Sequence, residues 1–329
     1  MPRGRYAPSP TGWLHLGNAR TALAAWWRAR AAGASFVMRV EDLDGPRTVQ
    51  EAVTGNLEEL RWLGIDWDEG PDVGGPHAPY EQSQRGEAYA RALSTLSAQG
   101  LTFDCWLSRK DLREMASAPH GRAPVYGPEQ RVANDRVAAR KQREGKTPAT
   151  RVRLPPGPVT FHDGLRGEVR ADVARDAGDL VLRRADGAWA YQLAVVVDDA
   201  AMNVREVVRA DDLLDATAGQ VALYHALGLA PPGFLHLPLL LDAGGQRLAK
   251  RRGDLTLRAL RDEGVRPARV VGWLAYGLGL LDAPREATAR ELVAAFDVTR
   301  LARHPARLDA DALAWIRAER RLDSGGTPR

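Results

Sequence analysis

The first hundred residues alternate between strand and helix patterns, and this alternation limits the fold more than any other feature. An extended start at 3–7 is followed by a loop at 8–12 and a helical pattern at 16–33, and a buried strand is expected at 35–40. Strands that alternate with helices form a parallel sheet covered by those helices. The sequence therefore predicts an α/β fold with a parallel sheet.

The pattern loosens between residues 101 and 180, where prolines punctuate short segments. This change suggests a subdomain inserted into the sheet. Strand signals return at 180–183 and 188–197, and they flank Asp186-Gly187, a turn pair typical of a hairpin. The tail after residue 245 is predicted to be all helical. The predicted division is a first half of the α/β domain at 1–100, an inserted subdomain at 101–180, a second half of the α/β domain at 181–245 and a helical domain at 246–329.

Composition excludes several classes of protein. Cys105 is the only cysteine, so neither an intrachain disulfide nor a metal site of several thiolates is expected. The start lacks a signal-type apolar stretch, and no run of about 18 apolar residues occurs, so we expect a cytoplasmic protein that does not enter membranes. The net charge of +4 suits an anionic partner. Only four of the 46 basic residues are Lys, so each retained Lys is of interest.

The segment between Arg5 and Asn18 is the first candidate site. It reads Arg-Tyr-Ala-Pro-Ser-Pro-Thr-Gly at 5–12 and His-Leu-Gly-Asn at 15–18. A strand that leads through such a loop into a helix presents N–H groups at the sheet edge where phosphates bind. His15 can donate to a phosphate oxygen, and Gly17 lets a flat base approach the backbone. The alternative stays open that His15 caps the helix and that Gly17 relieves crowding.

Acidic residues follow the next strand and form the second candidate site. The segment Arg39-Val-Glu-Asp-Leu-Asp44 places Glu41 at the C-terminal end of that strand, in the same crevice as His15. A substrate ammonium group would pair with Glu41 through charge-assisted hydrogen bonds. Helix caps and solvated turns also contain acidic clusters, so this alternative stays open.

The third candidate site is the loop 246–254, which reads Gln-Arg-Leu-Ala-Lys-Arg-Arg-Gly-Asp. A mobile cationic loop can close on a triphosphate and neutralise the charge that builds as pyrophosphate leaves. A surface charge run or a contact with a tRNA backbone is the alternative. Because Lys is a compact charge on a flexible stem and is rare in this chain, we interpret Lys250 as catalytic.

Together these segments resemble the class I aminoacyl-tRNA synthetases. Residues 5–18 resemble the first signature in its glutamyl form, and Arg247-Leu-Ala-Lys-Arg251 resembles the second. The segments 39–44, 191–199 and 209–214 are similar to the glutamyl-queuosine tRNA(Asp) synthetases, which are short paralogues of glutamyl-tRNA synthetase. The resemblance covers about residues 5–280 and implies a Rossmann-like catalytic domain, an inserted subdomain of the acceptor-binding type and a C-terminal helical domain.

The resemblance also implies roles for individual residues. Glutamate would need an anion for its ammonium group, here Glu41, and cations for its two carboxylates, here Arg5 and Arg209. Glutamine would leave a buried guanidinium without its counter-charge. The implied glutamate pocket comprises Arg5, Tyr6, Ala7, Pro8, Ser9, Glu41, Tyr191 and Arg209. The implied catalytic and ATP-binding residues are His15, Gly17, Asn18 and Lys250, with Mg²⁺ bridging the phosphates.

Two segments depart from the pattern of the family. In the second signature Arg247 and Ala249 replace the usual Lys and Ser. Relatives carry a zinc loop in the insertion, and the matching positions here lack the tetrahedral sulfur and nitrogen set, so no zinc is expected. His120 and His162 are the remaining candidate ligands, although solvated or capping roles are expected for them. The positions that match the zinc loop are Cys105, Leu107, Tyr126 and Gln130.

The implied activity is ATP-dependent formation of glutamyl-adenylate and transfer of glutamate to queuosine in the anticodon loop of tRNA(Asp) by a monomeric enzyme. The 79 residues after Lys250 are expected to form one helical unit that contacts an RNA stem, but not a second and distant recognition site. Two alternatives stay open. One is a truncated glutamyl-tRNA synthetase that charges a tRNA 3′ end, and the other is a catalytically silent paralogue that binds tRNA or glutamate.

Overall fold

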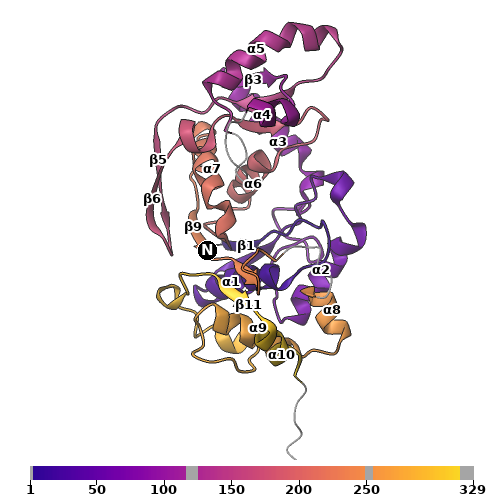
Figure 1. Cartoon of the computed structure of the whole chain (residues 1–329), viewed down its shortest axis with the longest axis vertical. Coiled ribbons are helices and arrows are strands. Elements are labelled where there is room, and N and C mark those ends of the chain that lie inside the picture. The colour runs from indigo at the N-terminus through magenta and orange to yellow at the C-terminus, as the bar shows by residue number, and fades with distance from the viewer. Residues whose placement is uncertain (1–2, 116–124, 249–254, 319–329) are drawn as a thin grey trace, which may run out of the picture.

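A computed structural model describes residues 3–115, 125–248 and 255–318. Figure 1 shows an elongated molecule with the central sheet in its middle, the inserted segment at one end and the C-terminal helices at the other. In these three ranges, no helix is both long enough and apolar enough to cross a membrane.

The central sheet is parallel, as predicted, except for the antiparallel strand β6 (Gly167–Asp172) at its edge. β1 (Arg3–Tyr6) pairs with β2 (Ser35–Met38), and β8 (Glu206–Ala210) pairs with β9 (Gly233–Leu237). The β1 and β8 strands lie side by side, since the backbone N–H of Arg205 donates to the carbonyl of Arg3 at 2.9 Å. Segments about 200 residues apart thus lie next to each other between β2 and β9, in the middle of the sheet.

Helices cover both faces of this sheet (Figure 1). One face packs against α1 (Leu16–Ala31) and α9 (Pro267–Gly277), which share a core with Val208 and Leu235. The other face packs against α6 (Tyr191–Ala201) and α7 (Leu214–Ala226). Alternate residues of a strand point to opposite faces, so Arg209 points to the side opposite Val208. Two further helices, α2 (Gln50–Trp62) and α3 (Gly86–Ala98), complete this part of the chain.

The inserted segment has its own antiparallel sheet of β3 (Thr102–Cys105), β4 (Ala149–Val152) and β7 (Leu180–Arg183). Its helices are α4 (Arg109–Met115) and α5 (Pro128–Arg143). The hairpin of β5 (Pro158–Asp163) and β6 (Gly167–Asp172) instead joins the central sheet, where Asp163 pairs with Phe234. One strand after residue 179, β7, therefore pairs with the insertion, and one strand before it, β5, pairs with the central sheet. The domain division at residue 180 stays a prediction.

The predicted strand at 188–197 is wrong. The turn at Asp186-Gly187 is present, and Arg184 N–H donates to the Ala188 carbonyl at 2.8 Å, but from Tyr191 onward the chain is the helix α6. Buried residues lie all along α6, so its apolar run has no readable polar face. Such a run cannot be assigned to strand or helix by periodicity alone.

The prediction of an all-helical tail is also wrong. A short strand, β11 (Ala306–Leu308), pairs in parallel with β10 (Leu240–Asp242). The helices α8 (Leu257–Asp262) and α10 (Ala310–Arg317) are present, but the segment 288–296 contains only a short 3₁₀ turn at Arg290–Leu292. Three-residue strands depend on a distant partner, so local periodicity does not reveal them.

Candidate active site

His15 occupies the N-cap of α1, directly after the loop that leaves β1. Its Nδ1 accepts hydrogen bonds from the backbone N–H groups of Gly17 at 3.0 Å and Asn18 at 3.3 Å, and the Asn18 side chain accepts one from His15 N–H at 3.2 Å. These bonds satisfy donors that a helix end leaves open. Because Nδ1 is an acceptor, the hydrogen of the neutral ring lies on Nε2. The capping role is therefore present, and Nε2 carries the ring hydrogen.

Gly17 makes room for the capping ring. A Cβ at this position would lie 2.9 Å from His15 Cε1 and 3.0 Å from Nδ1. The nearby Tyr6 side chain is buried in the α1 core, and its hydroxyl donates to the backbone carbonyl of Asn18 at 3.2 Å. The structure thus connects Tyr6 to the start of α1, while Arg5 points to the other face of β1.

The loop after β1 lies beside the chain that leaves β2. Glu41 N–H donates to the Pro8 carbonyl at 3.0 Å, which fixes the two segments together. In this loop Pro8 is buried, Ala7 is half-buried and Ser9 is exposed. The first and second candidate sites therefore meet at one edge of the sheet, as their positions at strand ends predicted.

The structure brings together four residues of the predicted glutamate pocket: Arg5, Glu41, Tyr191 and Arg209. Burial raises the pKa of the Tyr191 hydroxyl, the charge of Glu41 raises it further, and Arg209 and Arg5 lower it. All four side chains thus lie within electrostatic reach of one another. They come from β1, the segment after β2, the start of α6 and β8.

Arg209 is a buried cation without a described carboxylate as ion-pair partner. It is 4% exposed, its Nε donates to Nε2 of His236 at 3.0 Å, and its Nη2 donates to the Thr217 hydroxyl at 2.8 Å. Both acceptors are neutral, and burial lowers the pKa of Arg209. Burying a guanidinium without a counter-charge is costly, so this environment favours an anionic ligand.

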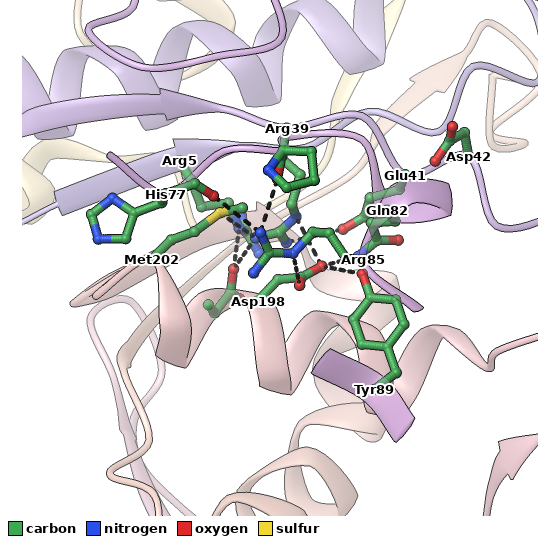
Figure 2. Close-up of polar contacts among 12 residues, drawn as sticks. Arg5, Arg39, Glu41, Asp42, His77, Gln82, Arg85, Tyr89, Asp198 and Met202 are labelled. Carbon is green, nitrogen blue, oxygen red and sulfur yellow. Dashed lines mark hydrogen bonds and ion pairs between the residues drawn. The ribbon is translucent and has the colours of Figure 1, made fainter. Parts of the chain in front are cut away.

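Arg39, which is labelled in Figure 2, links the anions of the pocket. It is fully buried and donates to Asp199 Oδ1 at 2.7 Å and to Glu41 Oε1 at 3.2 Å. Arg5 Nε lies 3.5 Å from the same Asp199 oxygen. Burial raises the pKa of Glu41, and the charges of Arg39 and Arg5 oppose that rise. The pocket is therefore preformed by alternating charges rather than by apolar packing.

A second set of polar contacts surrounds Asp198, the neighbour of Asp199 on α6. Figure 2 shows Gln82, Arg85 and Tyr89 converging on its carboxylate. Gln82 Nε2 and the Tyr89 hydroxyl each donate to Oδ2 at 2.8 Å, and Arg85 Nε donates to Oδ1 at 2.5 Å. Adjacent helix positions point in different directions, so the two aspartates connect α6 to two different parts of the chain.

Sequence reasoning missed Arg39, Asp198 and Asp199 as site residues, although all three lie in the segments that carried the family resemblance. A charged residue at a strand or helix end is usually solvated, and nothing local marks these three as buried. The Arg39–Asp199 bond joins residues 160 positions apart. Their placement inside recognised segments was the only signal.

The second signature is described only in part. Arg247 Nη1 forms an ion pair with Asp212 Oδ2 at 2.6 Å, and Leu248 is buried. This pairing connects the start of the loop to the segment after β8. Ala249 and Lys250 lie outside the described residues, so the catalytic role of Lys250 stays a prediction.

The four positions that match the zinc loop have other contacts. Cys105, Leu107 and Tyr126 are buried in a small apolar cluster with Leu112. Gln130 Oε1 accepts from Gly127 N–H at 2.9 Å and so caps α5. Of the two candidate histidines, His162 lies exposed on β5, and His120 is outside the described ranges. Apolar packing and helix capping thus involve the positions that match the zinc loop of relatives, and the absence of zinc stays a prediction.

Comparison with known proteins places this geometry in a family. Residues 2–315 match the family described as "tRNA synthetases class I (E and Q), catalytic domain". The chain is similar to a glutamate-tRNA synthetase structure from Elizabethkingia anophelis, with a TM-score of 0.83 and 28% identity over 96% of this chain and 70% of that one.

Two curated relatives are more similar in sequence, and both are named glutamyl-Q tRNA(Asp) synthetase. The protein of Symbiobacterium thermophilum is 49% identical over 98% of this chain and 99% of its own length. That of Nitratidesulfovibrio vulgaris is 50% identical over 85% of this chain and 87% of its own length. The chain therefore belongs to the class I tRNA synthetases of the E and Q type and, within them, to the glutamyl-Q tRNA(Asp) synthetase family.

Proposed function

We propose that this enzyme activates L-glutamate with ATP and transfers it to queuosine in the anticodon loop of tRNA(Asp). The observation that carries the substrate is Arg209, a buried cation whose two described acceptors are neutral. A ligand carboxylate would supply the missing counter-charge. The names and the near-complete coverage of the two glutamyl-Q relatives support the acceptor.

The remaining contacts of glutamate follow from the charges around Arg209. The substrate ammonium group would pair with Glu41, whose buried carboxylate gains from a further cation. Arg5 and Arg209 would bind the two carboxylates, and the Tyr191 hydroxyl would donate a hydrogen bond. Ala7, Pro8 and Ser9 would line the entrance, while Tyr6 would support the loop through its contact with the start of α1. Neutral glutamine would leave one guanidinium unpaired, which disfavours it.

ATP would bind at the start of α1 and contact Lys250. There the Nε2 hydrogen of His15 would donate to a phosphate oxygen, Gly17 would allow the base close to the backbone, and Asn18 would hold the cap rigid. An oxygen of the glutamate α-carboxylate would attack the α-phosphorus, and pyrophosphate would leave as Lys250 neutralises its charge. Mg²⁺ would arrive with ATP, because phosphates and water supply most of its ligands.

Transfer needs no covalent enzyme intermediate. A queuosine hydroxyl would attack the carbonyl carbon of the glutamyl-adenylate, lose its proton and release AMP. The anticodon arm would bind at the edge of the sheet where the loop after β1 and the segment after β2 lie, and arginines would contact the RNA backbone. We also propose that the enzyme acts as a monomer in the cytoplasm.

The acceptor can be tested directly with radioactive glutamate. Alkali-labile label should appear on tRNA(Asp) that contains queuosine and should be absent from tRNA(Asp) that lacks it. Label at the 3′ end of tRNA(Glu), with tRNA(Asp) untouched, would favour the glutamyl-tRNA synthetase alternative suggested by the structural similarity. Failure of glutamate-dependent ATP–pyrophosphate exchange, measured with tRNA present, would instead favour a silent paralogue.

A further inference from the structure

Three neighbouring strands place a row of polar side chains behind the predicted glutamate pocket. Asp163 ends β5, His236 lies on β9, and Arg209 lies on β8, where it is the direct cross-strand partner of His236. Asp163 and His236 are both fully buried. The carboxylate Oδ2 of Asp163 lies 2.7 Å from His236 Nδ1, and Arg209 Nε donates to His236 Nε2 at 3.0 Å.

The hydrogen bonds of Asp163 determine which ring nitrogen of His236 carries a hydrogen. Oδ1 accepts from the backbone N–H groups of Leu165 at 3.0 Å and Arg166 at 2.9 Å, and Oδ2 accepts from His236 N–H at 3.0 Å. A side chain surrounded by donors is an ionised carboxylate. His236 Nδ1 therefore donates to Asp163, and Nε2 is left as an acceptor for Arg209.

A neutral acceptor next to Arg209 has a specific consequence. A carboxylate at position 236 would hold the guanidinium equally well, but it would cancel the charge that the substrate needs. The imidazole of His236 instead accepts the hydrogen bond from Arg209 Nε. Because the ring lies between them, the guanidinium does not contact the charged Asp163 carboxylate. Thr217 fixes a second donor of the guanidinium, since its hydroxyl accepts from Nη2 at 2.8 Å.

We propose that Asp163 and His236 are positioning residues that orient Arg209 toward a substrate carboxylate without neutralising it, with Thr217 as a second support. The proposal rests on the proposed binding of glutamate by Arg209. It assigns a part in amino-acid selection to the β5–β6 hairpin, which contains Asp163 and joins the central sheet next to β9 (Figure 1).

Two substitutions at one position separate orientation from general packing. In His236→Gln the side-chain oxygen can take the place of Nε2 and still accept from Arg209. In His236→Asn the shorter amide retains the contact with Asp163 but does not reach Arg209. We expect KM for glutamate to rise about tenfold or more in His236→Asn and less than about threefold in His236→Gln, because only the first loses a hydrogen bond to a charged group. KM for ATP should change less than about twofold in both.

Thr217→Val provides a second measurement that leaves His236 in place. It preserves the shape of the side chain and removes the acceptor for Nη2, together with the hydroxyl's contacts to the Leu213 carbonyl at 3.1 Å and to His236 Nε2 at 3.1 Å. KM for glutamate should therefore rise several-fold with KM for ATP unchanged. Melting temperatures and calorimetric glutamate binding are measured for all three variants. Equal glutamate KM values for His236→Asn and His236→Gln, or a parallel rise in KM for ATP, would overturn the proposal. An inactive wild-type enzyme in glutamate-dependent exchange would overturn the proposed function instead.

Discussion

Two regions of the molecule bury different kinds of side chain: the predicted glutamate pocket at the sheet edge, called the pocket below, and the apolar cluster around Cys105 in the insertion, called the loop cluster. The pocket buries the charged side chains of Arg5, Arg39 and Asp199 and links them by hydrogen bonds. The loop cluster, formed by Cys105, Leu107, Leu112 and Tyr126, consists of uncharged side chains, and the buried charge beside it, Asp179, is paired with Arg131 at 2.7 Å. Buried charges cost free energy unless they are paired, whereas apolar packing stabilises directly. The linked charges of the pocket fit the proposed binding of a charged ligand, whereas the uncharged contacts of the cluster fit a loop that only has to be held in place.

The largest difference between the two regions should appear when a central cation is removed. Arg39→Met would leave Asp199 and Glu41 buried without their shared partner. We expect the free energy of unfolding to fall by about 3–5 kcal/mol, as for other broken buried ion pairs. Urea denaturation measures this loss. Arg153→Met in the insertion is the matched control. Because Arg153 is exposed, this substitution should change the free energy of unfolding by no more than about 0.5 kcal/mol. Similar losses in both variants would show that burial of charge does not distinguish the regions.

The next effect concerns rate rather than stability. Lys250→Ala should lower glutamate-dependent ATP–pyrophosphate exchange about a hundredfold or more, because a charge contact to the departing pyrophosphate is worth about 2.7–4 kcal/mol. The fold should be unchanged by circular dichroism. Lys110→Ala is the control, since Lys110 is an exposed lysine on α4 of the insertion. Exchange near the wild-type level in Lys250→Ala would make Lys250 a surface charge.

A smaller effect is expected for a single contact to the substrate. Arg209→Ala should raise KM for glutamate by about ten- to a hundredfold, because it removes charge-assisted hydrogen bonds, and should leave KM for ATP nearly unchanged. Steady-state exchange at varied glutamate and varied ATP separates the two constants. Equal rises in both would remove Arg209 from the amino-acid pocket.

The sequence predicted those parts of the pocket that depend on local segments. Arg5, Glu41 and Arg209 follow from strand ends and recognised motifs, and the structure brings them together. The partners of these residues could not be predicted, because Asp163 and His236 are 73 positions apart and neither belongs to a recognised segment. Helix α6 was mistaken for a strand since burial along its length hides the helical period. Both the buried polar contacts of the pocket and the β10–β11 pair form between segments that are distant in the sequence, so local patterns do not reveal them.

The smallest effect is expected on removing metal from the insertion. We predict that the purified protein carries no stoichiometric zinc, so treatment with a chelator should leave its melting temperature unchanged. The Cys105 thiol donates to the Leu107 carbonyl at 3.8 Å, whereas a zinc ligand would be a thiolate. Leu107 offers no ligand atom, and Gln130 already accepts a backbone hydrogen bond that caps α5. Elemental analysis after dialysis measures the zinc content. About one zinc per chain, together with a lower melting temperature after chelation, would show that the loop cluster depends on metal as well as on apolar packing.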